Sequence, residues 1–533
     1  MKHKNPHRYS VKQSFIHGTM ILLAAGIINR ILGFVPRIAL PRMIGAEAVG
    51  LYQMSYPFMI MVLTVITGGV PLAIAKLVAE AEARGDDKHI RNIMRTALLL
   101  TMMLSLIFTA FCIIAAPWIT TRLLTDSRVY WTFMCMTPMI IIVGISSIYR
   151  GFFQGKHNMI PTAASQIAET IVRIAAMLGF AYMLLPYGLD KAAAGAMLGV
   201  LCGEICGMLV LLWHAANKGR SAPEQPAPAR IPSSPVSGEA SILRRMLKIA
   251  IPVTASKLVG SVSYSLELVM IVQSLAVAGV ASTVATAQYG MLSGMVIPVL
   301  LLPSALTFSL SVSLIPSLSE ASASGDMITI HKRLHQSLRL ALVTGAPFAV
   351  IMFVLAEPLC YYLYHNLEIA PMLQLMAPAA LFMYFQAPLN ATLQALDRPG
   401  TALLNTFIGS AVKLFLIYQL VTKPQWGIMG AVIAISANIM LVTILHWVST
   451  VRLLRFKMAA GDFLKVLGAM GLMAVVCHLI MYRPWSDLLL LKFIGSMTAG
   501  VILYILCMFG TGQIDKSDLV RVPWIGRLLS RWF

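Results

Sequence analysis

Long apolar blocks, separated by short polar or Pro/Gly-containing segments, run along almost the whole chain. Several reach about 20 residues with few charges, the length that a helix needs to cross a bilayer core of about 30 Å. Blocks such as LLLTMMLSLIFTAFCIIAA (98–116) are continuous rather than alternating, which excludes transmembrane β-strands and predicts helices. The pattern predicts about fourteen spans, at 15–42, 50–79, 96–118, 131–153, 161–185, 191–215, 246–275, 283–317, 337–357, 371–395, 400–422, 427–450, 461–482 and 488–510.

Composition and charge are consistent with a membrane location. Of the 533 residues, 58% are hydrophobic and 12% are charged, whereas a soluble chain is about half apolar and about a quarter charged. We therefore expect an integral, multi-pass membrane protein. With the N-terminus inside, 28 of the 41 Lys and Arg residues fall in cytoplasmic segments, which predicts that both termini are cytoplasmic. The net charge of +20 is then a topology signal, because a nucleic-acid-binding protein would need a basic soluble domain.

Weak self-similarity at an offset of about 240 residues predicts an internal duplication. The stretch EAEARGD at 80–86 recurs as EASASGD at 320–326, and Val172-Arg173 matches Val412-Lys413. Six spans, an even number, separate equivalent points, so the two halves should have the same orientation in the membrane.

The predicted organisation is all-α, with two six-helix lobes and an additional C-terminal helix pair. The N-terminal lobe spans 1–216, a flexible cytoplasmic linker rich in Pro, Ala and Ser spans 217–244, and the C-terminal lobe spans 245–455. Residues 456–533 hold spans thirteen and fourteen and an amphipathic cytoplasmic tail. This arrangement is typical of a transporter whose halves rock around a central site.

Ionisable side chains inside the spans predict a polar cavity. Each would cost roughly 2.5–3.5 kcal/mol at the centre of a lipid-exposed helix, so they should face water or one another. The acids are Glu169, Glu204 and Glu267, and the cations that we predict to bind substrate are Arg30, Arg37, Arg173, Lys257 and Lys413. A cavity in which cations outnumber acids favours an anionic headgroup, and the planar fork of Arg suits phosphate or diphosphate.

The spacing of the first arginines adds detail. Arg30 and Arg37 are two helical turns apart on one face, with Gly33 and Pro36 between them, and Pro36 predicts a kink. Arg30 lies in the middle of its span, which favours the cavity over an interfacial position. Arg37 is nearer an end, and both readings stay open.

The other charged positions have structural alternatives. Glu169 and Arg173 are four residues apart and can pair along one face, either as an internal salt bridge or as substrate ligands. Lys257 and Glu267 do not share a face, so each needs a partner elsewhere. Glu204 lies in GEICG, where two glycines allow close helix approach; it is either a coupling group or a buried hydrogen-bonded acid.

Motifs for common enzyme chemistry are absent from the sequence. It has no GxxxxGK[ST], HExxH or GxSxG pattern, and the acids of the predicted outer loops are scattered singly, so no catalytic residue and no enzyme are predicted. The seven cysteines lie in apolar runs, and Cys202 and Cys206 have no completing His or acid cluster, so we predict no metal site.

Three blocks resemble a known family. They are GIINRILGFVPRIALPRMIGAEAVGLYQM (26–54), GVPLAIAKLVAEAEARGD (69–86) and SIYRGFFQGKHNMIPTAASQIAE (147–169). They are similar to the stage V sporulation protein B group, in the polysaccharide-exporter branch of the multidrug/oligosaccharidyl-lipid/polysaccharide (MOP) superfamily, which includes MurJ-type lipid II flippases. The resemblance implies fourteen helices, alternating access, a lipid-linked saccharide as cargo and a link to spore-cortex peptidoglycan synthesis.

The resemblance also bears on individual positions. First-span arginines are functional in MurJ-type proteins, and the pattern R-x-L-G-F transfers that role to Arg30. Arg37 lies one residue beyond the next family position, which Pro36 occupies. The extra helix pair of such flippases is thought to form a groove for the lipid tail, a role that would fall to the region from Phe463 to Met508.

The sequence thus predicts a flippase of the bacterial cytoplasmic membrane that moves an undecaprenyl-diphosphate-linked peptidoglycan precursor outward. No cofactor is predicted. The drive is either a proton or sodium ion bound at Glu169, Glu204 or Glu267, or the membrane potential acting on the anion. Predicted partners are the lipid-linked saccharide, membrane lipids and proteins of cell-wall or cortex synthesis, with no nucleic acid. The alternatives are a flippase for a capsule or exopolysaccharide unit, a multidrug antiporter, which the cation-rich cavity disfavours, and a polytopic membrane enzyme.

Overall fold

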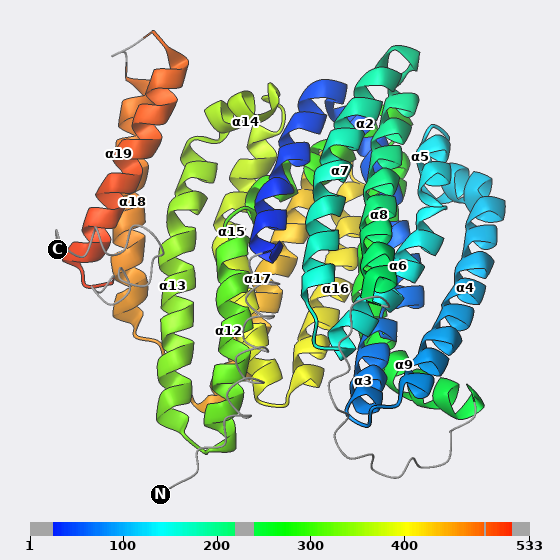
Figure 1. Ribbon diagram of the computed structural model, residues 1–533. Coiled ribbons are helices and arrows are strands. Elements are labelled where there is room, and N and C mark those ends of the chain that lie inside the picture. The colour runs from blue at the N-terminus through cyan, green and yellow to red at the C-terminus, as the bar shows by residue number, and fades with distance from the viewer. Residues whose placement is uncertain (1–24, 219–238, 484–486, 514–533) are drawn as a thin grey trace, which may run out of the picture. The chain divides into compact units, whose positions relative to one another are not determined.

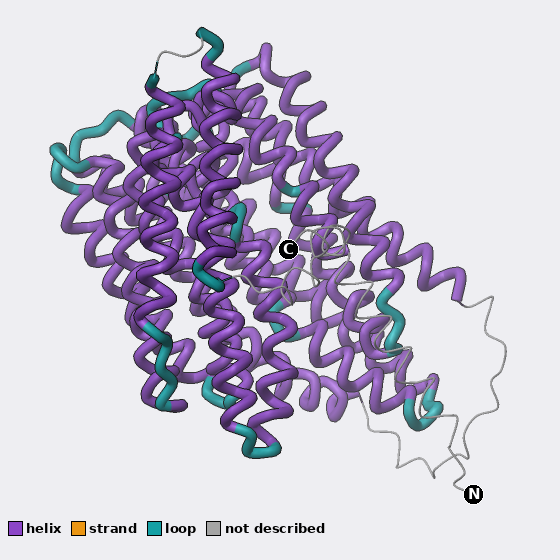
Figure 2. The backbone as a smooth tube through the Cα atoms, turned by 90° about the vertical axis from the view of Figure 1, so that its left-hand side faces the viewer, coloured by secondary structure: helices purple, strands orange, loops and turns teal. Residues whose placement is uncertain are grey.

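The computed structural model describes residues 25–218, 239–483 and 487–513, and every regular element in these ranges is a helix (Figure 1). The tube drawing shows the same helices from the side (Figure 2). Thirteen helical stretches of this described part are long and apolar enough to cross a membrane. The first of them, Ala25–Glu82, has 58 residues and covers two of the predicted spans. The all-helical fold with about fourteen spans is therefore confirmed.

The chain forms two compact units, Met1–Gly294 and Met295–Phe533. In the first, a short helix over 25–32 precedes α2 (Phe34–Thr67), α3 (Val70–Glu82), α4 (Asp87–Trp118), the π-helical η1 (Ile119–Leu123), α5 (Val129–Met136), α6 (Met139–Gly155), α7 (Ile160–Leu184), the 3-10 turn η2 (Leu185–Tyr187), α8 (Leu189–Lys218), α9 (Glu239–Val277) and α10 (Ser282–Tyr289). The π-helical η3 (Gly290–Val296) leads into the second unit.

The second unit begins with two short helices and continues through long ones. Its elements are α11 (Ile297–Leu301), α12 (Ser304–Ala323), α13 (Met327–Val354), α14 (Ala356–Tyr364), α15 (Ala370–Ala395), α16 (Pro399–Val421), α17 (Gly427–Leu454), α18 (Ala460–Tyr482) and α19 (Leu489–Gly510). The helices α18 and α19 pack against each other and on α13 through buried apolar residues that include Leu342, Met473 and Phe493. The Tyr504 hydroxyl donates to the Val343 carbonyl at 3.0 Å, which fixes α19 on α13.

Two spans depart from the simple apolar blocks of the sequence. In α2, Gly45 has φ 79° and ψ 172°, a conformation open essentially to glycine alone, so one helical run turns where two spans were expected to be separate. The predicted span 283–317 is broken between α11 and α12. Pro303 stands at this break, and it has no N–H to donate to the carbonyl four residues earlier.

The predicted duplication recurs in the backbone. Left-handed residues fall in pairs about 240 positions apart: Gly85 with Gly325, Thr125 with His365, His157 with Asp397, and Gly188 with Gly427. In both copies an aspartate follows the glycine and caps the next helix. Asp86 accepts from the His89 N–H at 2.9 Å, and Asp326 accepts from the Thr329 N–H at 3.0 Å. The same helix ends and turns therefore occur in the same order in both halves.

The predicted lobe boundaries stay a prediction. Most of the 217–244 linker and all of the 521–533 end of the amphipathic tail lie outside the described residues. The compact units divide later in the chain, after Gly294, because α9 and α10 pack on the helices before them.

Candidate functional site

Four charged side chains from three neighbouring helices form an intramembrane charge cluster in the first unit. Arg150 belongs to α6, Glu169 and Arg173 to α7, and Glu204 to α8. Arg150 Nη2 donates to Glu169 Oε2 at 2.8 Å, and Arg173 Nη1 donates to Glu169 Oε1 at 3.1 Å. Glu169 is only 8% exposed, and each oxygen of this buried carboxylate accepts a hydrogen bond from one arginine. The predicted pairing of Glu169 with Arg173 is confirmed.

Glycines bring Glu204 onto this cluster. A Cβ atom added at Gly203 would lie 2.6 Å from Arg173 Cβ, and one added at Gly207 would lie 3.2 Å from Glu169 Cβ. The close helix approach expected at GEICG is therefore confirmed. Glu204 interacts electrostatically with the Glu169 carboxyl group, and its Oε2 is buried with no hydrogen-bond donor.

A row of tyrosines extends the polar face from this cluster. Tyr52 of α2 lies within electrostatic range of both Arg37 and Arg173, and its ring stacks on Tyr56 with the centroids 6.5 Å apart. Tyr56 in turn interacts with Tyr264 of α9. On a straight helix Arg37 and Tyr52 would be about 22 Å apart. Because α2 turns at Gly45, two of the predicted substrate cations come within range of one hydroxyl group.

The two arginines of the first span have different surroundings. Arg37 is exposed, and its guanidinium carbon lies 5.6 Å from the centre of the Phe34 ring. Arg30 is half-buried in the helix that precedes α2, beyond a turn at Gly33. The helix is interrupted at Gly33, and the kink predicted at Pro36 stays a prediction. An open hollow of about 460 Å³ on α2 is lined by Val35, Ile38, Ala39, Arg42 and Met43.

Lys257 of α9 has a backbone partner. Its Nζ donates to the Gly68 carbonyl at 2.7 Å, and the Thr254 hydroxyl accepts from the Gly69 N–H at 2.9 Å. Both backbone groups lie where the helical run is interrupted between α2 and α3, so α9 satisfies them. A Cβ atom at Gly69 would collide with the Ala250 carbonyl, which explains the glycine there.

The remaining predicted residues, Glu267 and Lys413, belong to other helices. Glu267 of α9 is half-buried and interacts electrostatically with Tyr264 and Tyr289. Lys413 is 7% exposed on α16, in the second unit. The structure thus brings Arg173, Glu169 and Glu204 together in the first unit, with Arg37 and Arg173 both within electrostatic range of Tyr52, and Lys257 supports a helix break.

Sequence reasoning missed Arg150 and the tyrosines. Arg150 counted as a cytoplasmic loop residue, although it lies inside α6 and contacts Glu169. Its position nineteen residues before a buried acid gives no helical signal, because the contact joins two helices. The sequence analysis assigned no role to the tyrosines, although the spacing of four between Tyr52 and Tyr56 places them on one helix face.

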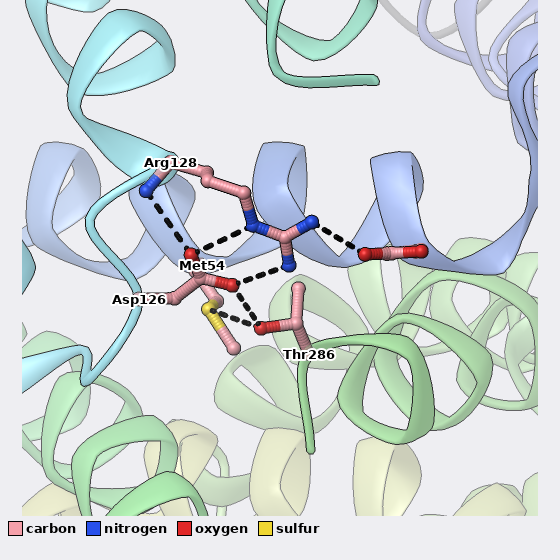
Figure 3. A network of polar contacts seen from close by, with 5 residues as sticks. Met54, Asp126, Arg128 and Thr286 are labelled. Carbon is pink, nitrogen blue, oxygen red and sulfur yellow. Dashed lines mark hydrogen bonds and ion pairs between the residues drawn. The ribbon is translucent and has the colours of Figure 1, made fainter. Parts of the chain in front are cut away.

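A second polar network joins three segments outside the charge cluster (Figure 3). Asp126, in the loop after η1, is 4% exposed and accepts from Arg128 Nε at 3.0 Å, from Arg128 Nη2 at 2.8 Å and from the Thr286 hydroxyl of α10 at 2.7 Å. Arg128 also donates to Glu47 of α2. Burial alone would raise the pKa of Asp126, but the hydrogen bonds from Arg128 and Thr286 hold that pKa below its ordinary value. We call these four residues the Asp126 network.

Backbone packing reinforces the Asp126 network. A Cβ atom at Gly50 of α2 would collide with the Thr286 carbonyl, and one at Gly290 would collide with the Ala46 carbonyl. The helices α2 and α10 therefore touch backbone to backbone beside the buried ion pair. In the described residues no group of three His, Cys, Asp or Glu side chains could hold a metal ion.

Comparisons with known proteins place the chain in a family. Residues 15–322 match the family model described as polysaccharide biosynthesis protein, and residues 257–419 match the model described as MatE. Stage V sporulation protein B of Bacillus subtilis (strain 168) is 38% identical over 98% of this chain and 100% of that protein. Lipid II flippase MurJ of the same strain is 25% identical over 80% of each chain.

The fold agrees with this assignment. A solved structure of lipid II flippase MurJ in an inward closed conformation has a TM-score of 0.70 and 17% identity, and the match covers 94% of this chain and 100% of that one. At that identity the likeness shows a shared fold. Together with the full-length sequence match, these findings show that this multi-pass membrane protein belongs to the polysaccharide biosynthesis protein family, within the stage V sporulation protein B group of the MOP superfamily.

Proposed function

We propose that the protein is a flippase that moves a lipid-linked saccharide with a diphosphate headgroup across the membrane. The observation that carries this proposal is the polar face of the first unit, where Arg37 and Arg173 both act on Tyr52 inside membrane-spanning helices. Relatives and solved structures whose names state an activity are flippases and transporters. A cationic face within an apolar helix bundle suits an anion that must leave water without losing its hydrogen-bond partners.

The roles of the residues follow from their surroundings. Arg37 is exposed and forms no ion pair with a carboxylate of the described residues, so its guanidinium group is placed to meet a diphosphate. Arg173 keeps one bond to Glu169, and its side chain is still 29% exposed. The hydroxyl groups of Tyr52 and Tyr56 supply neutral donors between them. Arg30 is a further proposed substrate-binding cation of the first unit, and Lys257 contributes by holding the α2–α3 break. Lys413 is the proposed substrate-binding cation of the second unit.

The finer proposal concerns the cargo and the orientation. We propose an undecaprenyl-diphosphate-linked peptidoglycan precursor, used in spore-cortex synthesis, because the 38% identical relative is a stage V sporulation protein and a 25% identical relative is a lipid II flippase. Both termini would be cytoplasmic in a bacterial cytoplasmic membrane, as the distribution of basic residues predicts. The second candidate is a flippase for another polyprenyl-linked saccharide, which the polysaccharide biosynthesis family model favours.

The drive for transport has two candidate sources. A membrane potential that is negative inside favours outward movement of an anion by about 2.3 kcal/mol per charge per 100 mV. Ion coupling would use Glu169, Glu204 or Glu267. Of these, Glu169 and Glu204 touch each other and the arginines, whereas Glu267 lies near tyrosines.

Complementation tests this proposal. The chain is expressed in a bacterium depleted of its own lipid II flippase, and lipid II in the outer leaflet is measured. We expect rescue by the wild type and by Arg84→Ala, which removes an exposed arginine between α3 and α4, and no rescue by Arg30→Ala or Arg37→Ala. Membrane insertion is checked for every variant. Failure of well-inserted wild type would refute the peptidoglycan cargo, and full rescue by both span variants would refute the cation face.

A further inference from the structure

The intramembrane charge cluster contains two carboxyl groups and two guanidinium groups, and two of its buried polar atoms, Arg150 Nε and Glu204 Oε2, have no hydrogen-bond partner among the described residues. Glu169 receives one arginine bond on each oxygen. Glu204 of α8 interacts electrostatically with Glu169, and no donor reaches its Oε2, which is buried. A buried carboxyl oxygen that has no donor and lies beside a second carboxylate favours a proton on one of the two groups, because two carboxylates only accept and repel each other.

We propose that Glu169 and Glu204 form a proton-binding site that holds one shared proton, and that occupancy of this site controls anion binding at Arg173. This inference rests on the proposed flippase function, since it assigns a regulating ligand to the same polar face. The proton resides on Glu204, because Glu169 already receives two charged donors and is the better acceptor.

The surroundings of Glu204 define what the proton changes. Arg150 faces it from α6, and Glu169 and Arg173 face it from α7; on α2, Tyr52 interacts with Arg173. With the proton in place, two arginines and one carboxylate leave the cluster with a net charge of +1. When the proton leaves to water, the net charge becomes zero, and Glu204 becomes a buried carboxylate without a donor.

Loss of the proton acts on Arg173 for a geometric reason. The donors beside Glu204 are those of Arg150 and Arg173, and the close approach at Gly203 and Gly207 keeps α7 and α8 from separating. The Glu204 carboxylate therefore competes with the anion for Arg173. When Glu204 is protonated, this competition is absent. Proton binding and anion binding are then linked, and each favours the other by the same factor.

Infrared spectroscopy of the purified full-length protein tests the site without any cargo. A protonated carboxyl band that titrates with pH is expected in the wild type, and Glu204→Gln should remove it, because the amide replaces the hydroxyl donor to Glu169 with the same shape. Glu368→Gln, which changes an exposed acid of the second unit, should leave the band intact. Absence of the band in the wild type, or its persistence in Glu204→Gln, would overturn the proton site.

Binding of undecaprenyl diphosphate in detergent tests the linkage. The wild type should lose affinity as pH rises, by roughly 5- to 150-fold, the usual range of coupling between two sites. Glu204→Gln should bind at all pH values as the wild type binds at low pH. A wild-type affinity independent of pH would overturn the linkage.

Two further outcomes separate this inference from the proposed function. If undecaprenyl diphosphate does not bind but the carboxyl band still titrates, the proposed cargo is refuted and the proton site is supported. If Glu204→Gln cannot be obtained in folded form, the infrared measurement is made on Glu169→Gln instead, because a shared proton needs both carboxyl groups. A band that titrates identically in Glu169→Gln and in the wild type would refute sharing.

Discussion

Replacing Asp126 by alanine tests whether the Asp126 network holds α2, the η1–α5 loop and α10 together. The carboxylate accepts two side-chain bonds and one backbone bond from Arg128, and one bond from the Thr286 hydroxyl. Removing one partner of a fully buried ion pair costs about 3–5 kcal/mol. Arg128 keeps Glu47 as a partner, and its side chain is 32% exposed, so part of this cost is recovered.

We therefore expect Asp126→Ala to lower the free energy of unfolding by about 2–4 kcal/mol. The thermal midpoint, measured on detergent-solubilised protein at neutral pH, should fall by roughly 2–4 °C. The matched control is Asp87→Ala, which removes an exposed carboxylate from the first turn of α4 and should change stability by no more than about 0.5 kcal/mol. Equal midpoints for the two variants would refute the reasoning.

The pH dependence gives an independent check. The native pKa of Asp126 lies below the ordinary value, so its stabilisation is fully present above that ordinary value and is lost as pH falls through the native one. Wild type should therefore lose more stability in acid than Asp126→Asn, which has no proton to gain. Parallel stability curves for the two proteins in the acid range would contradict the assigned hydrogen bonds.

Other predictions concern backbone packing and the helix break. Gly50→Ala should greatly reduce folded protein on gel filtration, because its Cβ would collide with the Thr286 carbonyl, whereas Gly468→Ala, with open space around it, should be tolerated. Lys257→Met should destabilise the fold by about 1–3 kcal/mol in a thermal midpoint assay, because the Gly68 carbonyl loses its ammonium donor; an unchanged midpoint would remove this structural role.

Apolar length and charge placement were enough to predict the helices, because every span must bury its backbone hydrogen bonds within itself. The breaks within helical runs were harder to predict from the sequence. Gly68 and Gly69 sit inside one apolar block, and only the contact with Lys257 and Thr254 of α9 shows that a helix is interrupted there. Such a break depends on a partner 185 residues away, which spacing along one helix does not reveal.

The candidate site was predicted where its contacts are local. Glu169 and Arg173 pair at helical spacing, so the sequence alone indicated them. Arg150 reaches the same carboxylate from another helix, and Arg37 reaches Tyr52 because α2 turns at Gly45. These contacts depend on how helices pack and turn, and the charge count of a span contains no information on either.

Comparison of the two halves at the matched positions shows that only the first half has the residues of the charge cluster. At an offset of 240 residues, Arg173 corresponds to Lys413, but Glu169 corresponds to Gly409 and Arg150 to Asn390. Both halves have a cation at this position, whereas only the first half has the acid Glu169 and the second arginine, Arg150. Because a proton needs a carboxyl group near the cation to regulate it, the proposed linkage belongs to the first half.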